Sequence, residues 1–377
     1  MPATQPEMIA ASASVPVPPS HSPHFHRLTV ANICRETSDS VSIVFDIPEE
    51  LASEYRFSPG QYLTLRAVID GEDTRRSYSI CSGPGDSDLR VLVKKVEDGL
   101  FSSWINDNLK IGDELEVMTP TGRFGLAHAP GNGRINVGFA AGSGITPILS
   151  ILRGVLELEP DSRFFLFYGS RSTADILFRN ALEELKDRFL DRLSIFHVLS
   201  REEQDIPILN GHLDGEKVRL FLTSMIPAAL VDHAFICGPE GMIGDVEATL
   251  RQLGLPEDRI HTERFLSVQG GRPRKRAKIA ADAPPAHVAA LIVDGKRRNV
   301  PVAAGETVLD AALRAGMDLP FACKGGMCST CRARIAEGEV SMDVNYSLEP
   351  WEIEAGFVLT CQSHPKSARL VVDFDHL

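Results

Sequence analysis

Four cysteines near the carboxyl end of the chain have a spacing that could bind iron. Their pattern is C-x4-C-x2-C followed by a distant fourth cysteine, which is the plant-type ligand spacing of a 2Fe-2S cluster. Zinc is the main alternative, but zinc sites usually combine two C-x2-C pairs, and this chain has one. The predicted ligands of a one-electron carrier are therefore Cys323, Cys328, Cys331 and Cys361.

A second candidate site closes a predicted strand in the first third of the chain, at Arg76-Ser77-Tyr78-Ser79. A guanidinium can bind a pyrophosphate, an aromatic face can lie on an isoalloxazine ring, and a hydroxyl can reach the reactive nitrogen of that ring. The alternative is a strand end with an exposed arginine and a packed tyrosine. The four residues resemble the R-x-Y-S signature of the ferredoxin-NADP reductase family, and this resemblance implies an FAD site with Tyr78 and Ser79 next to the chemistry.

About twenty residues further on, Gly99 and Ser102 open a predicted helix that runs to Asn108. Helix N-termini present unpaired amides and the positive end of the helix dipole, which attract phosphate. The same residues could serve only as a helix cap. Their position after the first motif favours binding of the FAD phosphates.

A glycine-rich loop, Ala140-Ala-Gly-Ser-Gly-Ile-Thr-Pro147, lies between a predicted strand and a predicted helix. Gly142 and Gly144 would let the backbone approach a pyrophosphate, and Thr146 adds a hydroxyl. Proline suits the start of a helix, where its missing amide costs no hydrogen bond. This segment predicts a nicotinamide dinucleotide site.

The next predicted strand ends at Ser170 and Arg171, where dinucleotide enzymes distinguish their two cofactors. No carboxylate stands there to hold a ribose 2'-hydroxyl, whereas a hydroxyl donor and a guanidinium suit a 2'-phosphate. We therefore predict NADPH rather than NADH. A solvated arginine in a loop is the alternative.

Cys237-Gly238-Pro239 closes a later predicted strand and resembles the C-G-P motif of the same family, which implies a thiol beside the nicotinamide. A buried structural cysteine before a turn is an equally good explanation. Further on, Glu263-Arg-Phe265 ends the region with an aromatic ring that could cover the site or belong to the core.

The secondary-structure elements predicted to position these residues follow three different patterns along the chain. Residues 25–130 alternate short strands with turns, which predicts an antiparallel β-barrel that binds FAD. Residues 131–266 alternate strands and helices, which predicts a doubly wound parallel α/β domain that binds NAD(P). Residues 288–377 begin with a hairpin signal at Asp294-Gly295 and contain the cysteines, so we expect an α+β ferredoxin domain of the β-grasp type.

Two segments lie outside these domains. Residues 1–24 contain six prolines and lack the features of a signal peptide, so we expect a disordered tail. Residues 267–287 combine glycine, proline and five basic residues, which predicts a linker that would let the cluster move between flavin and partner. A nucleic-acid-binding role for this basic run is the weaker alternative.

The composition restricts the functional class. The 377-residue chain has a formal net charge of -12, which disfavours nucleic-acid binding, and no apolar run of membrane-spanning length. Seven cysteines are an odd number, and four of them have cluster spacing, so a disulfide framework is not expected. We predict a cytoplasmic protein without a membrane or nucleic-acid partner.

Taken together, the motifs resemble the ferredoxin-NADP reductase family fused to a C-terminal plant-type ferredoxin, as in reductases of the phthalate dioxygenase type. The resemblance spans residues 25–377. Within this group the chain is similar to the reductase subunits of phenylacetyl-CoA epoxidases, which are multicomponent monooxygenases of phenylacetate degradation. The segments that carry this likeness are Arg75–Cys81, Phe235–Pro239, Cys323–Gly326, Asn345–Pro350 and Val371–Asp375.

This resemblance implies an electron-transfer enzyme in which NADPH reduces FAD, and the 2Fe-2S cluster then delivers single electrons to a di-iron oxygenase. A reductase for another acceptor, such as a Rieske oxygenase or a hybrid-cluster protein, is the second possibility. A sensor that holds the same cofactors without sustained turnover is the third. The acidic residues between Glu337 and Glu354 are a candidate docking face, although a solvated surface explains them better.

Overall fold

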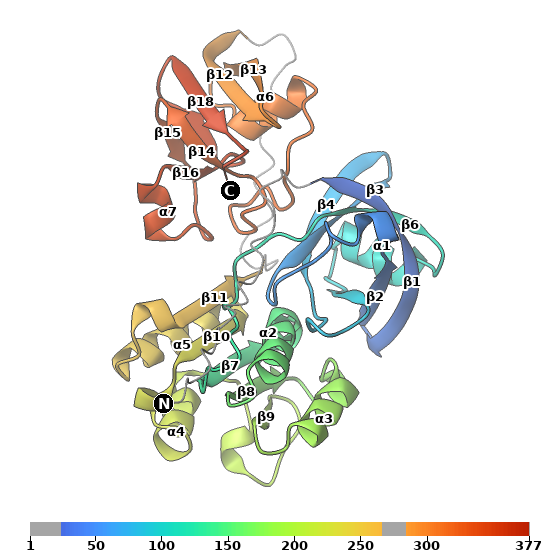
Figure 1. Cartoon of the computed structure of the whole chain (residues 1–377), viewed down its shortest axis with the longest axis vertical. Helices are drawn as coiled ribbons and strands as arrows, with labels where there is room; N and C mark the ends of the chain where they lie inside the picture. Colours follow the sequence, from blue (N-terminus) through green and yellow to red (C-terminus); the bar gives the residue numbers. More distant parts are fainter. Residues whose placement is uncertain (1–23, 266–283, 377) are drawn as a thin grey trace, which may run out of the picture.

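The computed structural model describes residues 24–265 and 284–376. Figure 1 shows three modules: a β-barrel in blue and cyan, an α/β domain in green and yellow, and a ferredoxin domain in orange and red. The predicted disordered tail, residues 1–24, and the predicted linker, residues 267–287, lie almost entirely outside the described residues. The ferredoxin domain's first strand begins at Pro285, inside the range expected for the linker.

The first module is a six-stranded antiparallel sheet with the order β4-β3-β6-β1-β2-β5. An isolated bridge between Ile80 and Val91 joins its two edges, so the sheet closes into the predicted barrel. Its core is filled by inward-facing aliphatic side chains such as Leu28, Ile43 and Leu65. The elements are β1 (Phe25–Thr37), β2 (Ser40–Asp46), β3 (Tyr62–Ile69), β4 (Glu72–Ser79), β5 (Leu89–Lys94), α1 (Leu100–Asn108) and β6 (Glu114–Met118).

The β3–β4 hairpin extends through a polar segment, since β4 starts at Glu72. Glu72 and Asp73 have low strand propensity, but each is paired with β3. The turn at Asp70-Gly71 has positive φ angles of 52° and 80°, which match a tight two-residue hairpin. Cross-strand pairing therefore overrides local propensity here.

The second module is a five-stranded parallel sheet with the order β11-β10-β7-β8-β9, which confirms the doubly wound prediction. The residues of α2 and α3 contribute to one apolar core and those of α4 and α5 to another, so helices cover both faces. The strands are β7 (Ile135–Ala141), β8 (Arg163–Ser170), β9 (Leu193–Leu199), β10 (His233–Gly238) and β11 (Ile260–Arg264). The helices are α2 (Ile145–Leu158), α3 (Arg179–Arg188), α4 (Gly215–Ser224) and α5 (Glu240–Gln252).

The starts of two helices in this module have local causes. Helix α3 begins at Arg179, because the preceding Phe178 adopts a left-handed conformation with φ 56°. Helix α4 begins at Gly215. Its start has a local signal, since the Asp214 carboxylate accepts a hydrogen bond from the Lys217 amide at 3.0 Å.

The third module is a mixed sheet with the order β13-β12-β18-β14-β16, beside the small pair β15-β17. The predicted hairpin is confirmed, with Asp294 and Gly295 at φ 51° and 70°. Helix α6 contributes Val308 and Leu309 to the domain core. The elements are β12 (Pro285–Val293), β13 (Lys296–Ala303), α6 (Val308–Arg314), β14 (Arg332–Glu337), β15 (Val340–Met342), α7 (Pro350–Glu354), β16 (Phe357–Leu359), β17 (Ser363–Pro365) and β18 (Arg369–Asp373).

Among the described residues, none of the helices combines the length and apolar character that crossing a membrane requires.

Candidate functional site

A cavity of about 2070 Å³ lies where the three modules meet. The barrel contributes Tyr78 and Ser79, the α/β domain contributes Thr146, and the ferredoxin domain contributes Cys323 and Cys328. Motifs separated by more than two hundred residues in the sequence therefore line one space. This shared cavity is the candidate site for the cofactors.

The R-x-Y-S motif occupies the last four positions of β4, beside the cavity. Tyr78 is stacked on Phe101 of α1, with ring centroids 6.1 Å apart, and this contact holds the Tyr78 ring in place. Arg76 is exposed, and its guanidinium donates to the carbonyl of Arg75 at 2.7 Å. The hydroxyl of Ser77 is within 3.2 Å of the Thr64 hydroxyl on β3, so this side chain is already used within the sheet.

Gly99 and Ser102 shape the loop that enters α1. The Ser102 hydroxyl accepts a hydrogen bond from the Val96 amide at 3.1 Å and donates to the Gly99 carbonyl at 3.3 Å. A Cβ atom at Gly99 would lie 2.6 Å from that hydroxyl, which explains the glycine. The Ser102 hydroxyl therefore binds backbone groups at the start of the helix, which is the alternative stated for these residues. The same loop also lines the cavity.

The glycine-rich loop and the Cys237-Gly238 turn are packed against each other. A Cβ atom on Gly144 would lie 2.1 Å from the Cys237 carbonyl oxygen, so only glycine fits there. Gly142 has φ 54°, and the Thr146 hydroxyl donates to the Ser143 carbonyl at 2.9 Å. The two predicted nucleotide motifs thus lie together at the carboxyl ends of the neighbouring strands β7 and β10.

Cys237 itself does not line the cavity, since its side chain is fully buried behind this contact. Burial raises the pKa of its thiol well above the ordinary value, and nearby Glu263 adds to this effect. The thiol is therefore neutral. Its placement beside a nicotinamide stays a prediction, and Pro239 serves as the N-cap residue of α5.

Glu263 on β11 lines the site. The sequence indicates it only as part of Glu263-Arg-Phe265, where the aromatic ring is the candidate. Its carboxyl group accepts a hydrogen bond from the Ser79 hydroxyl at 3.2 Å, so it joins the α/β domain to the flavin motif. Burial raises the pKa of Glu263 to about 8, against the opposing effect of the Ser79 hydrogen bond. A carboxyl group that is protonated at neutral pH can hold or donate a proton next to the flavin position.

This raised pKa predicts a pH-dependent effect of Glu263→Gln on the stability of the cofactor-free protein. Because the folded-state pKa lies above the ordinary value of 4.5, the folded state binds the extra proton, and stability is lost as pH rises toward about 8. We expect Glu263→Gln to unfold at a higher temperature than the wild type at pH 9 and at an equal temperature at pH 4.5. Thermal unfolding across this range tests it, and a difference that does not change with pH would contradict the raised pKa.

Ser170 and Arg171 lie at the carboxyl end of β8, outside the cavity lining. Ser170 is buried and Arg171 is exposed. The Arg201 amide donates to the Arg171 carbonyl at 2.7 Å, which brings a second exposed arginine to this edge. The neighbouring Glu202, which no sequence motif indicated, binds the amide and hydroxyl of Thr173 at 2.7 and 2.6 Å.

The four cluster cysteines form two interacting pairs. Cys323 and Cys328 share a hydrogen bond, as do Cys331 and Cys361. In residues 24–265 and 284–376, no three His, Cys, Asp or Glu side chains converge as ligands of a single ion. Two pairs are what a 2Fe-2S cluster requires, because each of its irons takes two of the four protein ligands.

Backbone amides of the cysteine loop hydrogen-bond to sulfur. Within each pair the shared hydrogen bond lowers the pKa of one thiol, Cys323 or Cys361, and raises that of its partner, Cys328 or Cys331. The Gly325 amide donates to the Cys323 sulfur at 3.2 Å, and Lys324, Gly326 and Ser329 have positive φ angles that turn the loop inward. The hydrogen bond with Cys328, together with loop amides, lowers the pKa of Cys323 to about 6. The residues present therefore fit a 2Fe-2S cluster.

The barrel contacts this loop directly. The hydroxyl of Tyr62, which is buried at the start of β3, donates to the Cys328 carbonyl and lies 3.0 Å from the Thr330 hydroxyl. A second contact joins Arg123, after β6, to Glu352 of α7, which also pairs with Arg332 at 2.7 Å. Glu352 is fully buried, so the expectation of a solvated acidic surface is wrong at this residue.

Comparison with protein families assigns all three modules. A model of oxidoreductase FAD-binding domains matches residues 27–125, a model of oxidoreductase NAD-binding domains matches 139–248, and a model of 2Fe-2S iron-sulfur cluster binding domains matches 291–366. When bound, a flavin takes up electrons in pairs and releases them singly, and the cluster carries one electron. The fold and site define an oxidoreductase that combines FAD-binding, NAD-binding and 2Fe-2S domains.

The chain belongs to the family of reductase subunits of 1,2-phenylacetyl-CoA epoxidases. It is 45% identical to a 1,2-phenylacetyl-CoA epoxidase component from Escherichia coli over 353 residues, which cover 93% of this chain and 98% of the relative. It is 33% identical to the ferredoxin reductase component of a 3-ketosteroid-9-alpha-monooxygenase from Rhodococcus rhodochrous, with the same coverage. The solved structure of phthalate dioxygenase reductase is similar with a TM-score of 0.55 and 25% identity, covering 93% of this chain and 98% of that one.

Proposed function

We propose that this protein is the reductase component of a multicomponent oxygenase that acts on phenylacetyl-CoA. It would pass electrons from NADPH through FAD and the 2Fe-2S cluster to the oxygenase component. The substrate class is supported by the 45% identity to the phenylacetyl-CoA epoxidase component, which extends over nearly the whole length of both chains. The relatives from 3-ketosteroid-9-alpha-monooxygenases are less similar.

The contact between Tyr62 and the Cys328 carbonyl is the observation that carries the electron-transfer part of the proposal. It places the cluster loop against the strand that pairs with the flavin motif, since Tyr62 is opposite Ser79 in the β3–β4 register. From the flavin site, electrons then need to cross only one domain boundary to reach the cluster. The roles proposed for the chain's own residues follow from this arrangement.

Arg76, Tyr78, Ser79 and the loop at Gly99 and Ser102 would hold FAD, and the loop containing Gly142, Gly144 and Thr146 would hold the nicotinamide dinucleotide. The support is that the flavin motif, Gly99, Ser102 and Thr146 line the shared cavity. Glu263 and Ser79 would keep a proton available at the boundary between the two cofactors. Cys323, Cys328, Cys331 and Cys361 would be the cluster ligands.

The choice of NADPH over NADH is proposed from the edge formed by β8 and β9. Two exposed arginines, Arg171 and Arg201, meet there through their backbones. Glu202 is an opposing charge at this edge, because the hydrogen bonds from Thr173 lower its pKa and keep its carboxylate ionised. The preference for NADPH therefore depends on the two arginines outweighing this carboxylate. Guanidinium groups suit a 2'-phosphate, so we favour NADPH.

Replacing Arg171 by alanine tests this preference. We expect the KM for NADPH to rise about tenfold and the KM for NADH to change less than about twofold, because one phosphate contact is removed. Steady-state ferricyanide reduction with each cofactor measures both constants. Equal effects on the two KM values would contradict the proposal that Arg171 binds the 2'-phosphate of NADPH.

The electron acceptor is proposed to be the di-iron oxygenase component of the same enzyme system. Reconstitution tests this directly: the purified holoprotein is mixed with the oxygenase subunits of a phenylacetyl-CoA epoxidase, phenylacetyl-CoA and NADPH. We expect NADPH oxidation that depends on the oxygenase and matches epoxide formation. Turnover only with a 3-ketosteroid monooxygenase, or NADPH oxidation without epoxide formation, would mean that the reductase has a different oxygenase partner.

We place this reductase in the cytoplasm. The described cysteines form no disulfide bond, and thiols together with an iron-sulfur cluster suit a reducing compartment. Fractionation of cells that express the tagged chain tests this location.

A further inference from the structure

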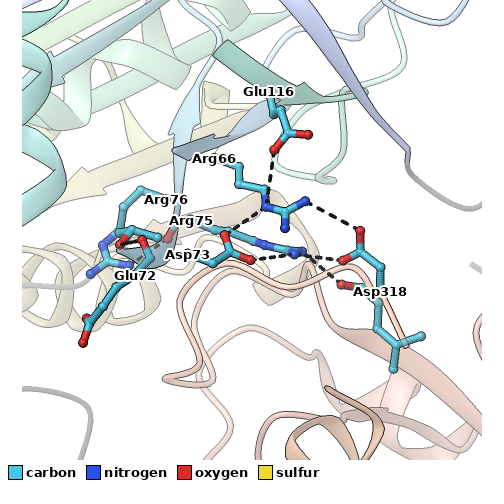
Figure 2. A network of polar contacts seen from close by, with 9 residues as sticks. Arg66, Glu72, Asp73, Arg75, Arg76, Glu116 and Asp318 are labelled. Carbon is cyan, nitrogen blue, oxygen red and sulfur yellow. Dashed lines mark hydrogen bonds and ion pairs between the residues drawn. The ribbon is translucent and has the colours of Figure 1, made fainter. Parts of the chain in front are cut away.

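An arginine of the flavin barrel is inserted into the surface of the ferredoxin domain (Figure 2). The side chain of Arg75, on β4, is only 2% exposed. Its guanidinium donates to the Asp318 carboxylate at 2.8 Å and to the Leu319 carbonyl at 3.3 Å. Both acceptors precede the cysteine loop, so the contact joins the barrel to the segment that leads into the cluster ligands.

Two aromatic rings lie close to the same guanidinium. Its carbon lies 4.1 Å from the ring centroid of Phe321 and 5.0 Å from that of Phe25. Phe321 belongs to the ferredoxin domain and stands two residues before Cys323, whereas Phe25 belongs to β1. Cation–π contacts of this kind gain strength when the cation is desolvated. Arg75 thus binds the ferredoxin domain through charge, a carbonyl and a ring.

Carboxylates around Arg75 fix its orientation. Asp73 accepts from Arg75 at 3.1 Å and from Arg66 at 2.9 Å, and Arg66 also lies 3.5 Å from Glu116 and 3.7 Å from Asp318. Asp73 and Glu116 belong to the barrel, so their contacts with the two arginines do not depend on the ferredoxin domain. Separation of the domains would leave Arg75 with Asp73 and expose its guanidinium to water in place of Asp318, Leu319 and Phe321. The charge-assisted hydrogen bond to Asp318 and the contact with the Phe321 ring are therefore made only in the docked arrangement.

The position of Arg75 along the hairpin gives this contact a geometric role. Arg75 is opposite Arg66 in the β3–β4 pairing, and Tyr62 stands four residues before Arg66 on β3. Strand geometry separates the two positions by about 13 Å. Arg75 before the cysteine loop and Tyr62 within it are therefore two well-spaced contacts of the barrel with the ferredoxin domain, and the pair of Arg123 with Glu352 of α7 is a third. Contacts spaced in this way restrict rotation as well as separation.

We propose that Arg75 is a positioning residue for electron transfer, which fixes the segment from Asp318 to Phe321 on the barrel so that the cysteine loop keeps its contact with Tyr62. The proposal rests on the internal flavin-to-cluster step of the proposed function and is independent of the final acceptor. Arg75 differs in this from its neighbour Arg76, which faces the cavity and makes no contact with the ferredoxin domain among the hydrogen bonds and ion pairs of the described residues.

The test compares Arg75→Met and Asp318→Asn with Arg27→Met as the matched control. Arg27 is a 75% exposed barrel arginine whose ion pair, with Glu114, stays within the barrel. Stopped-flow mixing of each holoprotein with NADPH measures how fast the cluster is reduced, and ferricyanide reduction measures the flavin alone. Hydrogen exchange of peptides covering 72–79 and 317–323 reports docking independently of activity.

We expect Arg75→Met to slow cluster reduction about tenfold and to accelerate exchange in both peptides, while ferricyanide reduction stays within about twofold of the wild type. Asp318 is 63% exposed, so Asp318→Asn should give a smaller change, about threefold, in the same direction. Arg27→Met should change neither measurement. Asp318→Asn leaves the barrel side of the network intact, so it tests docking even if Arg75→Met binds less FAD.

Unchanged cluster reduction and unchanged exchange in Asp318→Asn, combined with FAD loss in Arg75→Met, would mean that Arg75 only stabilises the barrel and would overturn the proposal. Failure of the wild type itself to reduce its cluster with NADPH would instead refute the proposed function. The two failures are therefore distinguishable.

Discussion

Replacing Cys328 by serine is expected to abolish NADPH-dependent cytochrome c reduction while ferricyanide reduction continues. Cys328 belongs to the sulfur pair with Cys323, and its backbone carbonyl receives the Tyr62 hydroxyl. Loss of one thiolate would remove half of the protein ligands of one iron. We expect cytochrome c reduction to fall by about a hundredfold or more, since the protein has no other one-electron exit in the proposed relay. Ferricyanide can take electrons from the flavin directly.

Cys34→Ser is the matched control, because this thiol is exposed on β1 of the barrel and is not part of the cysteine loop. It should leave both activities and the cluster absorbance at wild-type values. Visible absorbance and iron content of Cys328→Ser show whether the cluster is lost. If Cys328→Ser lost both activities at full FAD content, electrons would not follow the order from flavin to cluster.

The motifs that the sequence revealed are all local. The cysteine spacing, Arg76-Ser77-Tyr78-Ser79 and the glycine-rich loop each lie within a dozen residues, apart from Cys361. Their geometry follows from a strand end, a helix start or a tight loop, so residue type and spacing are enough to recognise them. The alternation of strands and helices likewise predicted the barrel and the doubly wound sheet.

The contacts between modules could not be predicted in the same way. Tyr62 and Cys328 are 266 residues apart, and Arg75 and Asp318 are 243 residues apart. Arg75 lies directly before a recognised motif, yet nothing in its local pattern distinguishes a buried interdomain arginine from a solvated one. Glu352 shows the same limit, since it is part of an acidic stretch but is fully buried between two arginines.

Glu263 is an intermediate case. Its neighbour Phe265 drew attention to the end of β11, but its role depends on the β10–β11 register, which places it opposite Cys237, and on Ser79 from another domain. The predicted movement of the cluster on a linker stays a prediction, because residues 266–283 lie outside the described structure. The structure itself has the ferredoxin domain in contact with the barrel.

The second large effect is expected from Gly144→Ala, which adds a single methyl group where the nucleotide loop meets Cys237. The new Cβ atom would lie 2.1 Å from the Cys237 carbonyl oxygen and 2.8 Å from the Gly238 amide nitrogen. Both are backbone atoms of β10, so relief requires the loop to move away from the sheet. We expect NADPH-dependent activity to fall about a hundredfold, with a lower unfolding temperature of the α/β domain.

Gly244→Ala is the matched control for this methyl group. Gly244 lies within α5, and a Cβ atom there would have no neighbour within 4 Å. Alanine favours helix over glycine, so this variant should be unchanged or slightly more stable. Chemical reduction by dithionite bypasses the nucleotide, so Gly144→Ala should still reduce its flavin and cluster normally by that route. Normal NADPH kinetics in Gly144→Ala would contradict the close packing of the two motifs, whereas loss of dithionite reduction would mean that the defect reaches beyond the nucleotide domain.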